Sequence, residues 1–180
     1  MAPLLVILFL LLLACSAFFS SAETVYFSID PIQLRRIGEK HAATGERLRQ
    51  LLASPTRLLS TILIGNTLVN ISLSNVGYAL ARLWTPAYSE LVAIPAITLL
   101  LVFFGEIGPK NLGLFYTAAL ARVYAPVLRA AELLLAPPRA ALDRASRRLA
   151  HLFRPVGKTL SEEEFETVLD ISREEGILNA

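Results

Sequence analysis

The chain has 180 residues, of which 54% are hydrophobic, with a formal net charge of +2 and a mean hydropathy of +0.56. Three stretches carry no charged side chain: residues 1–22, 58–81 and 91–105. A helix that crosses a bilayer needs about 20 mainly apolar residues, and the third stretch reaches this length when it is extended to 87–107. The composition therefore excludes an ordinary soluble domain and predicts an all-α integral membrane protein.

The first apolar stretch predicts a membrane helix at residues 3–27, which ends before the turn-forming pair Asp30–Pro31. Two processing signals compete with this interpretation. Residues 12–15 (LLAC) resemble a lipoprotein cleavage box, and residues 20–22 (SSA) would suit a signal peptidase. Because no Lys or Arg precedes the apolar stretch, we expect the helix to be retained.

Two further membrane helices are predicted in the middle of the chain. Polar and basic residues 31–53 are expected to form a juxtamembrane helix, and Pro55 then suits the first position of a membrane helix at 55–83. A short linker with Trp84 and Tyr88, residue types found at membrane interfaces, leads into a third membrane helix at 87–107.

Residues 112–136 are apolar enough to suggest a fourth crossing, but they contain charged residues and an internal proline, namely Arg122, Arg129, Glu132 and Pro126. The distribution of basic residues decides between the two topologies. Segments 28–57 and 139–158 each contain six Lys or Arg, and such segments face the cytoplasm. They share a side only if an even number of crossings separates them.

We therefore expect three crossings, with the N-terminus outside and the C-terminus in the cytoplasm. The 112–136 segment then forms interfacial helices along the inner leaflet, broken at Pro126 and Pro137–Pro138. Residues 1–138 are the expected transmembrane domain. Residues 139–180 are expected to be a cytoplasmic basic linker and an acidic helix, in a chain that would continue into a further domain.

Polar residues recur at helical spacing inside the apolar segments. They are Ser16, Ser20 and Thr24 in the first helix and Asn66, Asn70 and Ser74 in the second. The end of the third helix contributes one carboxylate, Glu106, between Gly105 and Gly108 and shortly before Pro109. Hydroxyl groups in membrane helices often bond their own backbone or join helices, which is the simpler interpretation of Ser16. An intramembrane carboxylate is by default a functional candidate, and its alternative here is an ion pair between Glu106 and Lys110.

These side chains offer hydroxyl, amide and carboxylate oxygens, a donor set that suits a hard cation such as Mg²⁺, Ca²⁺ or Na⁺. Glycines and a proline beside Glu106 would also loosen the helix and free backbone carbonyls. Cys15 is the only cysteine, and His41 and His151 lie outside the apolar runs. These facts exclude an intrachain disulfide and an intramembrane serine–histidine pair. We expect no enzyme and no catalytic residue.

At these residues the chain resembles the CorC/cyclin-M family of magnesium transporters. The similar motifs are FFSSAET (18–24), GNTLVN (65–70) and GEIGPKN (105–111), followed by an acidic segment that in the family leads into paired CBS domains. The resemblance implies a homodimer with three transmembrane helices per subunit and juxtamembrane helices. It also implies Mg²⁺ export across the plasma (inner) membrane, coupled to Na⁺ influx.

The resemblance implies metal ligands at Ser20, Ser21, Asn66, Asn70, Gly105 and Glu106. Neighbouring residues that could position these ligands or gate the site are Ser16, Glu23, Thr24, Ser74, Gly108, Pro109 and Lys110. In the family, helix 1 has a glycine where this chain has Ser21, so its second ligand could be Ser21, Glu23 or a carbonyl. The acidic residues Glu162, Glu163, Glu164 and Glu166 would sense cytoplasmic Mg²⁺. The alternative for that segment is a solvated acidic face.

Mg²⁺ transport by a homodimer in the lipid bilayer is therefore the predicted function, with no nucleic acid as a partner. The alternative is a membrane protein that binds cations without transporting them and regulates another protein as a sensor or scaffold. An intramembrane enzyme is disfavoured, because no His or Lys base accompanies the serines at membrane depth.

Overall fold

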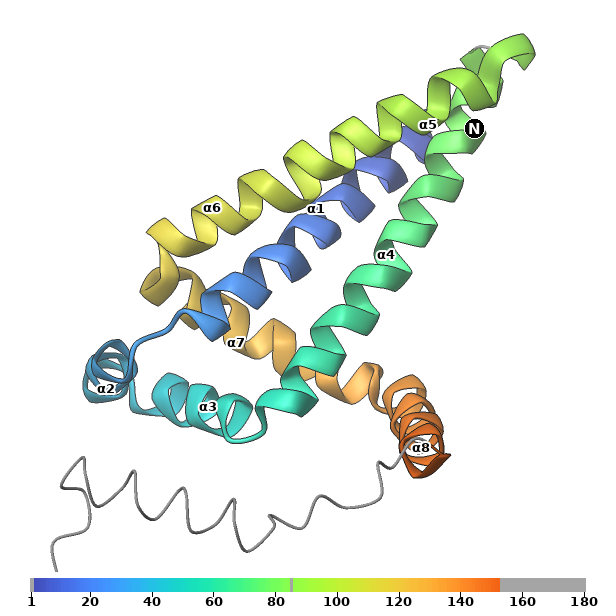
Figure 1. Cartoon of the computed structure of the whole chain (residues 1–180). Coiled ribbons are helices and arrows are strands. Elements are labelled where there is room, and N and C mark those ends of the chain that lie inside the picture. The colour runs from blue at the N-terminus through green and yellow to red at the C-terminus, as the bar shows by residue number, and fades with distance from the viewer. Residues whose placement is uncertain (1, 85, 153–180) are drawn as a thin grey trace, which may run out of the picture. The chain divides into compact units, whose positions relative to one another are not determined.

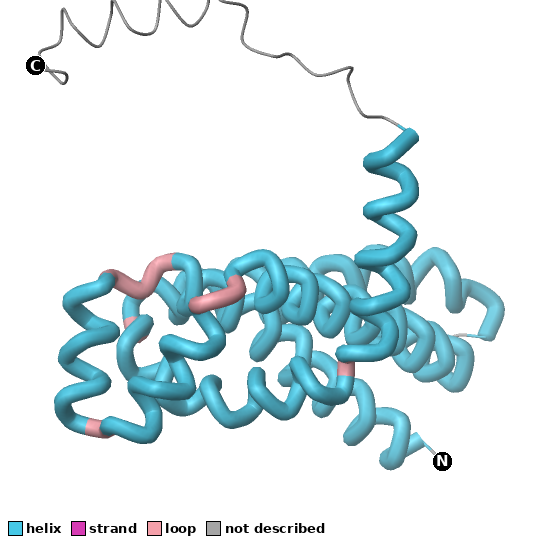
Figure 2. Tube along the Cα trace, turned by 90° about the horizontal axis from the view of Figure 1, so that it is seen from below, coloured by secondary structure: helices cyan, strands magenta, loops and turns pink. Residues whose placement is uncertain are grey.

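The computed structural model of the chain describes residues 2–84 and 86–152. The described residues are helical apart from short connections and contain no strand, as Figures 1 and 2 show. This confirms the predicted all-α membrane class. The chain divides into two compact units, Met1–Ala140 and Ala141–Ala180. The acidic segment with Glu162, Glu163, Glu164 and Glu166 lies outside the described residues.

The helices follow one another with short turns. Their bounds are α1 (Ala2–Phe27), α2 (Pro31–Lys40), α3 (Ala42–Leu52), α4 (Pro55–Trp84), the 3-10 helix η1 (Pro86–Tyr88), α5 (Ser89–Leu100), the π-helix η2 (Leu101–Ile107), α6 (Gly108–Phe115), α7 (Thr117–Leu134) and α8 (Ala136–Leu152). The segments Ala2–Phe27, Pro55–Trp84 and Ala93–Phe115 are long and apolar enough to cross a membrane.

The third long helix extends further than predicted. We expected it at 87–107, but α5, η2 and α6 form one continuous helical path to Phe115, which Figure 1 shows running alongside α1. Pro109 does not end the path because it lies in the first turn of α6, where a missing N–H is tolerated. The predicted juxtamembrane segment 112–136 therefore divides at Tyr116. Its first residues belong to the long helix, and α7 contains the residues from Thr117 to Leu134.

The two juxtamembrane segments break at other places than predicted. The 31–53 segment forms two helices, α2 and α3, which meet at His41, and the Asp30 side chain caps α2 by accepting the Ile32 N–H at 2.8 Å. Pro126 was expected to break the 112–136 segment, but α7 continues through it. Burial of Ala125 and Leu128 on its inner face explains why α7 persists despite one lost backbone hydrogen bond.

Helix α1 occupies the centre of the first unit. It contacts α4 on one side, η2 and α6 on the other, and α7 at its C-terminal end. At that end a buried cluster joins α1, α2, α3, α4 and α7, and its members are Ala22, Val25, Tyr26, Ile37, Leu48, Leu51, Leu58, Ile62, Ala121, Ala125 and Leu128. Large apolar side chains such as Leu68, Ile71 and Phe104 are exposed along the long helices, as a lipid-facing surface requires.

Candidate functional site

Ser16 of α1 lies close to residues of both other long helices. Its buried hydroxyl donates a hydrogen bond of 2.7 Å to the Asn70 amide oxygen on α4. On its other side lies Gly105 of η2, where an added Cβ would come within 2.9 Å of the Ser16 oxygen. A side chain at position 105 would therefore displace the Ser16 hydroxyl from its present position. Sequence reasoning gave Ser16 a supporting role, but the structure places it between the predicted ligands Asn70 and Gly105.

One helical turn further along α1, Ser20 faces the same junction. Its hydroxyl lies 3.5 Å from the Glu106 backbone carbonyl, at the long end of the hydrogen-bond range. Ser20 is buried, whereas the Glu106 side chain is partly exposed. Helix α1 thus carries two hydroxyl groups on the face that lies between α4 and η2.

The π-helical geometry of η2 affects its backbone oxygens. The N–H of Gly108 donates to the Phe103 carbonyl five residues earlier. Pro109 has no N–H, so it cannot bond the Gly105 carbonyl four residues before it, as an ordinary residue in an α-helix would. Single π-helical turns occur often at functional sites. Pro109 therefore removes one backbone donor from the turn that contains Gly105 and Glu106.

Asn66, one turn from Asn70 on α4, has a buried amide oxygen with no hydrogen-bond partner among the described residues. An unsatisfied buried acceptor costs about 1–3 kcal/mol. Such groups are few in folded proteins and call for an explanation, such as an unseen water or ion.

Glu106 forms no ion pair or side-chain hydrogen bond within the described residues. The alternative partner suggested by the sequence, Lys110, instead lies 3.3 Å from the Glu23 carboxylate on α1. Glu23 is thereby engaged in joining α1 to α6. An ionised carboxylate on a membrane helix costs free energy unless a cation lies close to it, and no Lys or Arg of the described residues does so for Glu106.

Three other predicted residues lie apart from this junction. The Ser21 hydroxyl donates to the Tyr124 hydroxyl of α7 at 2.8 Å, on a different face of α1 from Ser16 and Ser20. Thr24 packs where α1 meets Gly113 of α6. Ser74 is exposed and bonds the Asn70 backbone carbonyl of its own helix.

Glu132 is a buried carboxylate whose importance sequence reasoning missed. It was noted only as a charge that argued against a fourth crossing, yet its side chain is 3% exposed and lies 3.0 Å from Arg129 and 3.6 Å from Arg57. The contact with Arg57 ties α7 to the start of α4. The signal available in the sequence was an acidic residue on the inner face of an amphipathic helix.

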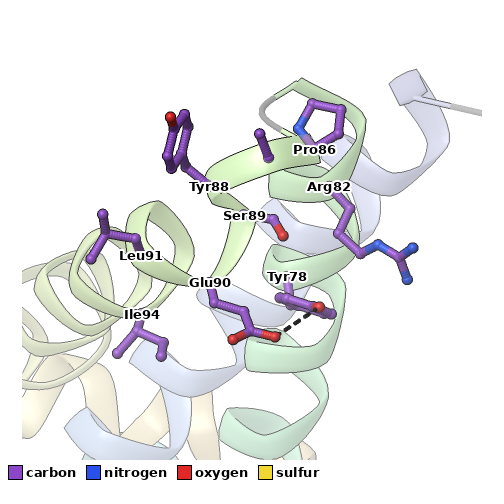
Figure 3. Close-up of a pocket in the computed structure, with 9 residues that line it drawn as sticks. Tyr78, Arg82, Pro86, Tyr88, Ser89, Glu90, Leu91 and Ile94 are labelled. Carbon is purple, nitrogen blue, oxygen red and sulfur yellow. Dashed lines mark hydrogen bonds between the residues drawn. The ribbon is translucent and has the colours of Figure 1, made fainter.

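A second polar hollow lies at the opposite end of α4, where η1 and α5 begin. This pocket of about 760 Å³ is lined by Tyr78, Arg82, Ser89 and Glu90 among others, and the Tyr78 hydroxyl lies 3.4 Å from the Glu90 carboxylate (Figure 3). None of the predicted metal ligands lines it. Within the described part of the chain, no three His, Cys, Asp or Glu side chains cluster so as to hold a metal ion.

The fold and the site define a class: a helical membrane module in which hydroxyl, amide and backbone carbonyl oxygens from three long helices lie close together. Residues 7–180 match the family model described as the Cyclin M transmembrane N-terminal domain. The chain belongs to this family, which confirms the resemblance seen in the motifs.

Curated relatives agree with this assignment. The chain is 30% identical over 164 residues to the UPF0053 inner membrane protein YfjD of Escherichia coli, covering 88% of this chain and 38% of that protein. It is 37% identical over 108 residues to a UPF0053 protein of Haemophilus influenzae, covering 58% of this chain and 26% of the relative. A UPF0053 protein of Synechocystis is 26% identical over 183 residues, covering 99% of this chain and 51% of the relative. The chain thus spans between 26% and 51% of the length of these relatives.

Proposed function

We propose that the chain is the ion-conducting module of a Mg²⁺ transporter. The observation that carries the proposal is the junction at Ser16 and Ser20, where two hydroxyls of α1 lie close to the Asn70 amide of α4 and the Glu106 backbone carbonyl of η2. Oxygen ligands with few carboxylates suit Mg²⁺, which keeps several of its waters. Membership of the cyclin-M family supports the same choice.

The proposed ligands are Ser20, Asn66, Asn70, the Gly105 carbonyl and Glu106. The unpartnered Asn66 oxygen would gain a partner when the cation binds. The hydrogen bond that the Ser16 hydroxyl donates to the Asn70 amide oxygen would break when this oxygen turns to the ion. Ser21 is the weakest of the implied ligands, because its hydroxyl would first have to leave Tyr124.

One carboxylate among neutral oxygens leaves a divalent ion incompletely neutralised. Binding of this kind is weak enough for release, as transport requires. In the proposed cycle the ion enters from the cytoplasm, binds at the junction and leaves on the other side. Helix α1 lies between the two other long helices, so a shift of α1 would change access to the junction.

Several finer proposals accompany this one. They are export coupled to Na⁺ influx, a homodimer, residence in the inner membrane with the N-terminus outside, and CBS domains in the full-length protein. The inner-membrane assignment is supported by the name of the Escherichia coli relative.

The proposal is tested by calorimetric titration of the purified chain with Mg²⁺, followed by Mg²⁺ flux into liposomes. We expect Glu106→Ala and Asn70→Ala to weaken Mg²⁺ binding at least tenfold and to abolish flux. Ser72→Ala is the matched control, because Ser72 is exposed on α4 and bonds its own helix carbonyl at Leu68. Unchanged binding in both site variants would contradict the intramembrane site.

The flux experiment separates the proposal from its alternative. If the parent chain binds Mg²⁺ at these residues but liposomes show no flux, a cation sensor or scaffold is favoured over a transporter. Mg²⁺ flux that the site variants abolish and Ser72→Ala retains would support transport.

A further inference from the structure

A basic cavity lies between α2 and α7, away from the junction at Ser16. It has a volume of about 310 Å³. Its polar lining comes from Gln33, Arg36 and Lys40 of α2, His41 after it, and Arg122 of α7, while Ile37 and Ala118 supply apolar lining. No acidic residue is found among the described residues that line it.

The cations around this cavity are not neutralised by neighbouring carboxylates. Arg36, Lys40 and Arg122 form no ion pair within the described residues. The nearest acidic residue along α2, Glu39, is bonded at 3.1 Å to Arg35. Arg122 uses its Nε to donate to the Ala118 carbonyl at 3.2 Å, which orients its guanidinium group. Three positive charges around one hollow favour an anion, and guanidinium groups match phosphate geometry.

Gln33 indicates that the ligand also carries a hydrogen-bond donor. Its amide oxygen is buried and has no hydrogen-bond partner within the described residues. A phosphate only accepts hydrogen bonds, so it cannot satisfy this oxygen. A ligand that carries both a phosphate and a hydroxyl or ammonium donor would satisfy the arginines and Gln33 together.

The position of the cavity identifies the source of such a ligand. Helix α7 contacts the C-terminal end of α1, and α2 follows the turn after α1, so both lie where the membrane helices end. The same two helices expose apolar side chains, including Ile32 of α2 and Val123 and Val127 of α7. Acyl chains would cover these side chains while the headgroup enters the cavity. Basic pockets at this depth suit anionic headgroups.

We propose that the α2–α7 cavity binds the headgroup of an anionic glycerophospholipid. Arg36, Lys40 and Arg122 contact its phosphate, and Gln33 accepts a hydrogen bond from a headgroup hydroxyl. The inference does not depend on transport, because no predicted Mg²⁺ ligand lines the cavity. A lipid held here would connect α2 to α7, and α7 in turn contacts α1.

The test is native mass spectrometry of the purified chain in neutral detergent, with phosphatidylglycerol, phosphatidylcholine or glycerol 3-phosphate as the probe. We expect phosphatidylglycerol to bind at least tenfold more tightly than phosphatidylcholine. Arg36→Gln/Arg122→Gln should weaken its binding by roughly tenfold or more, because each cation near a headgroup contributes about fivefold. The control Arg47→Gln/Arg144→Gln removes the same charge from exposed positions outside the cavity and should have little effect.

A neutral variant separates the cavity from the overall charge. Ala118→Phe fills the cavity and keeps every cation, so it should also weaken phosphatidylglycerol binding. Equal losses in the two arginine double variants, or full binding in Ala118→Phe, would overturn the proposal. Glycerol 3-phosphate binding as tightly as the lipid would overturn the lipid assignment in favour of a soluble phosphate.

Discussion

At the scale of single residues, the two asparagines of α4 differ in a way that separates a ligand from a packing residue. The Asn70 oxygen accepts the Ser16 hydroxyl, whereas the Asn66 oxygen is buried without a partner among the described residues. The Ser16–Asn70 bond is also what helix packing alone would produce. The unsatisfied Asn66 oxygen has no such explanation, because it lowers stability until a donor or a cation reaches it.

This contrast predicts opposite effects of the same substitution at the two positions. Without Mg²⁺, Asn66→Leu should raise the thermal unfolding temperature, since it removes an unsatisfied acceptor worth about 1–3 kcal/mol. Asn70→Leu should lower it, because the buried Ser16 hydroxyl loses its acceptor. Both variants should lose the rise in unfolding temperature that Mg²⁺ gives the parent chain.

The measurement is thermal unfolding in detergent with and without Mg²⁺, with Ser72→Ala as the control. A decrease for Asn66→Leu as large as that for Asn70→Leu would mean that Asn66 has a structural partner. Retention of the Mg²⁺ effect in Asn66→Leu would remove it from the ligand set.

The sequence was informative about which residues are polar within the membrane and less so about which residues they meet. Helical spacing placed Ser16, Ser20, Asn66 and Asn70 on common faces, and the structure brings Ser16 to Asn70. Spacing carries no information on contacts between helices. The Ser21–Tyr124 contact therefore could not be predicted, since it joins residues 103 positions apart.

At the scale of elements, hydropathy predicted the long helices well because bilayer thickness fixes their length. It placed the end of the third helix too early, because Gly108 and Pro109 resemble a stop signal. The structure instead uses a π-helical segment before Pro109 and continues to Phe115. Pattern alone does not distinguish a proline that ends a helix from one that starts the next helical segment.

The α2–α3 pair gives a sharper prediction at this scale. A Cβ added to Gly45 would lie 2.4 Å from the Gly38 Cα, so the two backbones touch. A Cβ added to Gly38 would meet the Arg49 side-chain nitrogen at 3.2 Å and the Gly45 Cα only at 4.0 Å. Arg49 is exposed and flexible enough to move.

Alanine favours a helix over glycine by roughly 1 kcal/mol at either position, so the two substitutions differ mainly in the clash. We expect Gly45→Ala to destabilise the chain by about 1–3 kcal/mol, and Gly38→Ala to be neutral or stabilising. Thermal unfolding in detergent compares the two. Equal tolerance of both substitutions would show that α2 and α3 can separate without loss.

At the scale of the whole molecule, orientation in the membrane follows from charge and the number of crossings. The basic segments 28–57 and 139–158 are separated by α4 and by the third long helix, so both lie on one side if each of these helices crosses once. The turn that contains Tyr88 then lies on the other side. Because basic segments favour the cytoplasm, we expect the α2–α7 cavity to lie at the inner leaflet.

Single cysteines test this arrangement in a Cys15→Ser background. Arg47→Cys, Tyr88→Cys and Arg144→Cys each replace an exposed side chain. In intact cells, a membrane-impermeant thiol reagent should label only Tyr88→Cys, and permeabilisation should expose the other two. Labelling of Arg144→Cys from outside, with Arg47→Cys still protected, would require a fourth crossing through α7. In that topology Arg122, Arg129 and Glu132 would lie within the bilayer, and the buried Glu132–Arg57 contact could not form at the membrane surface.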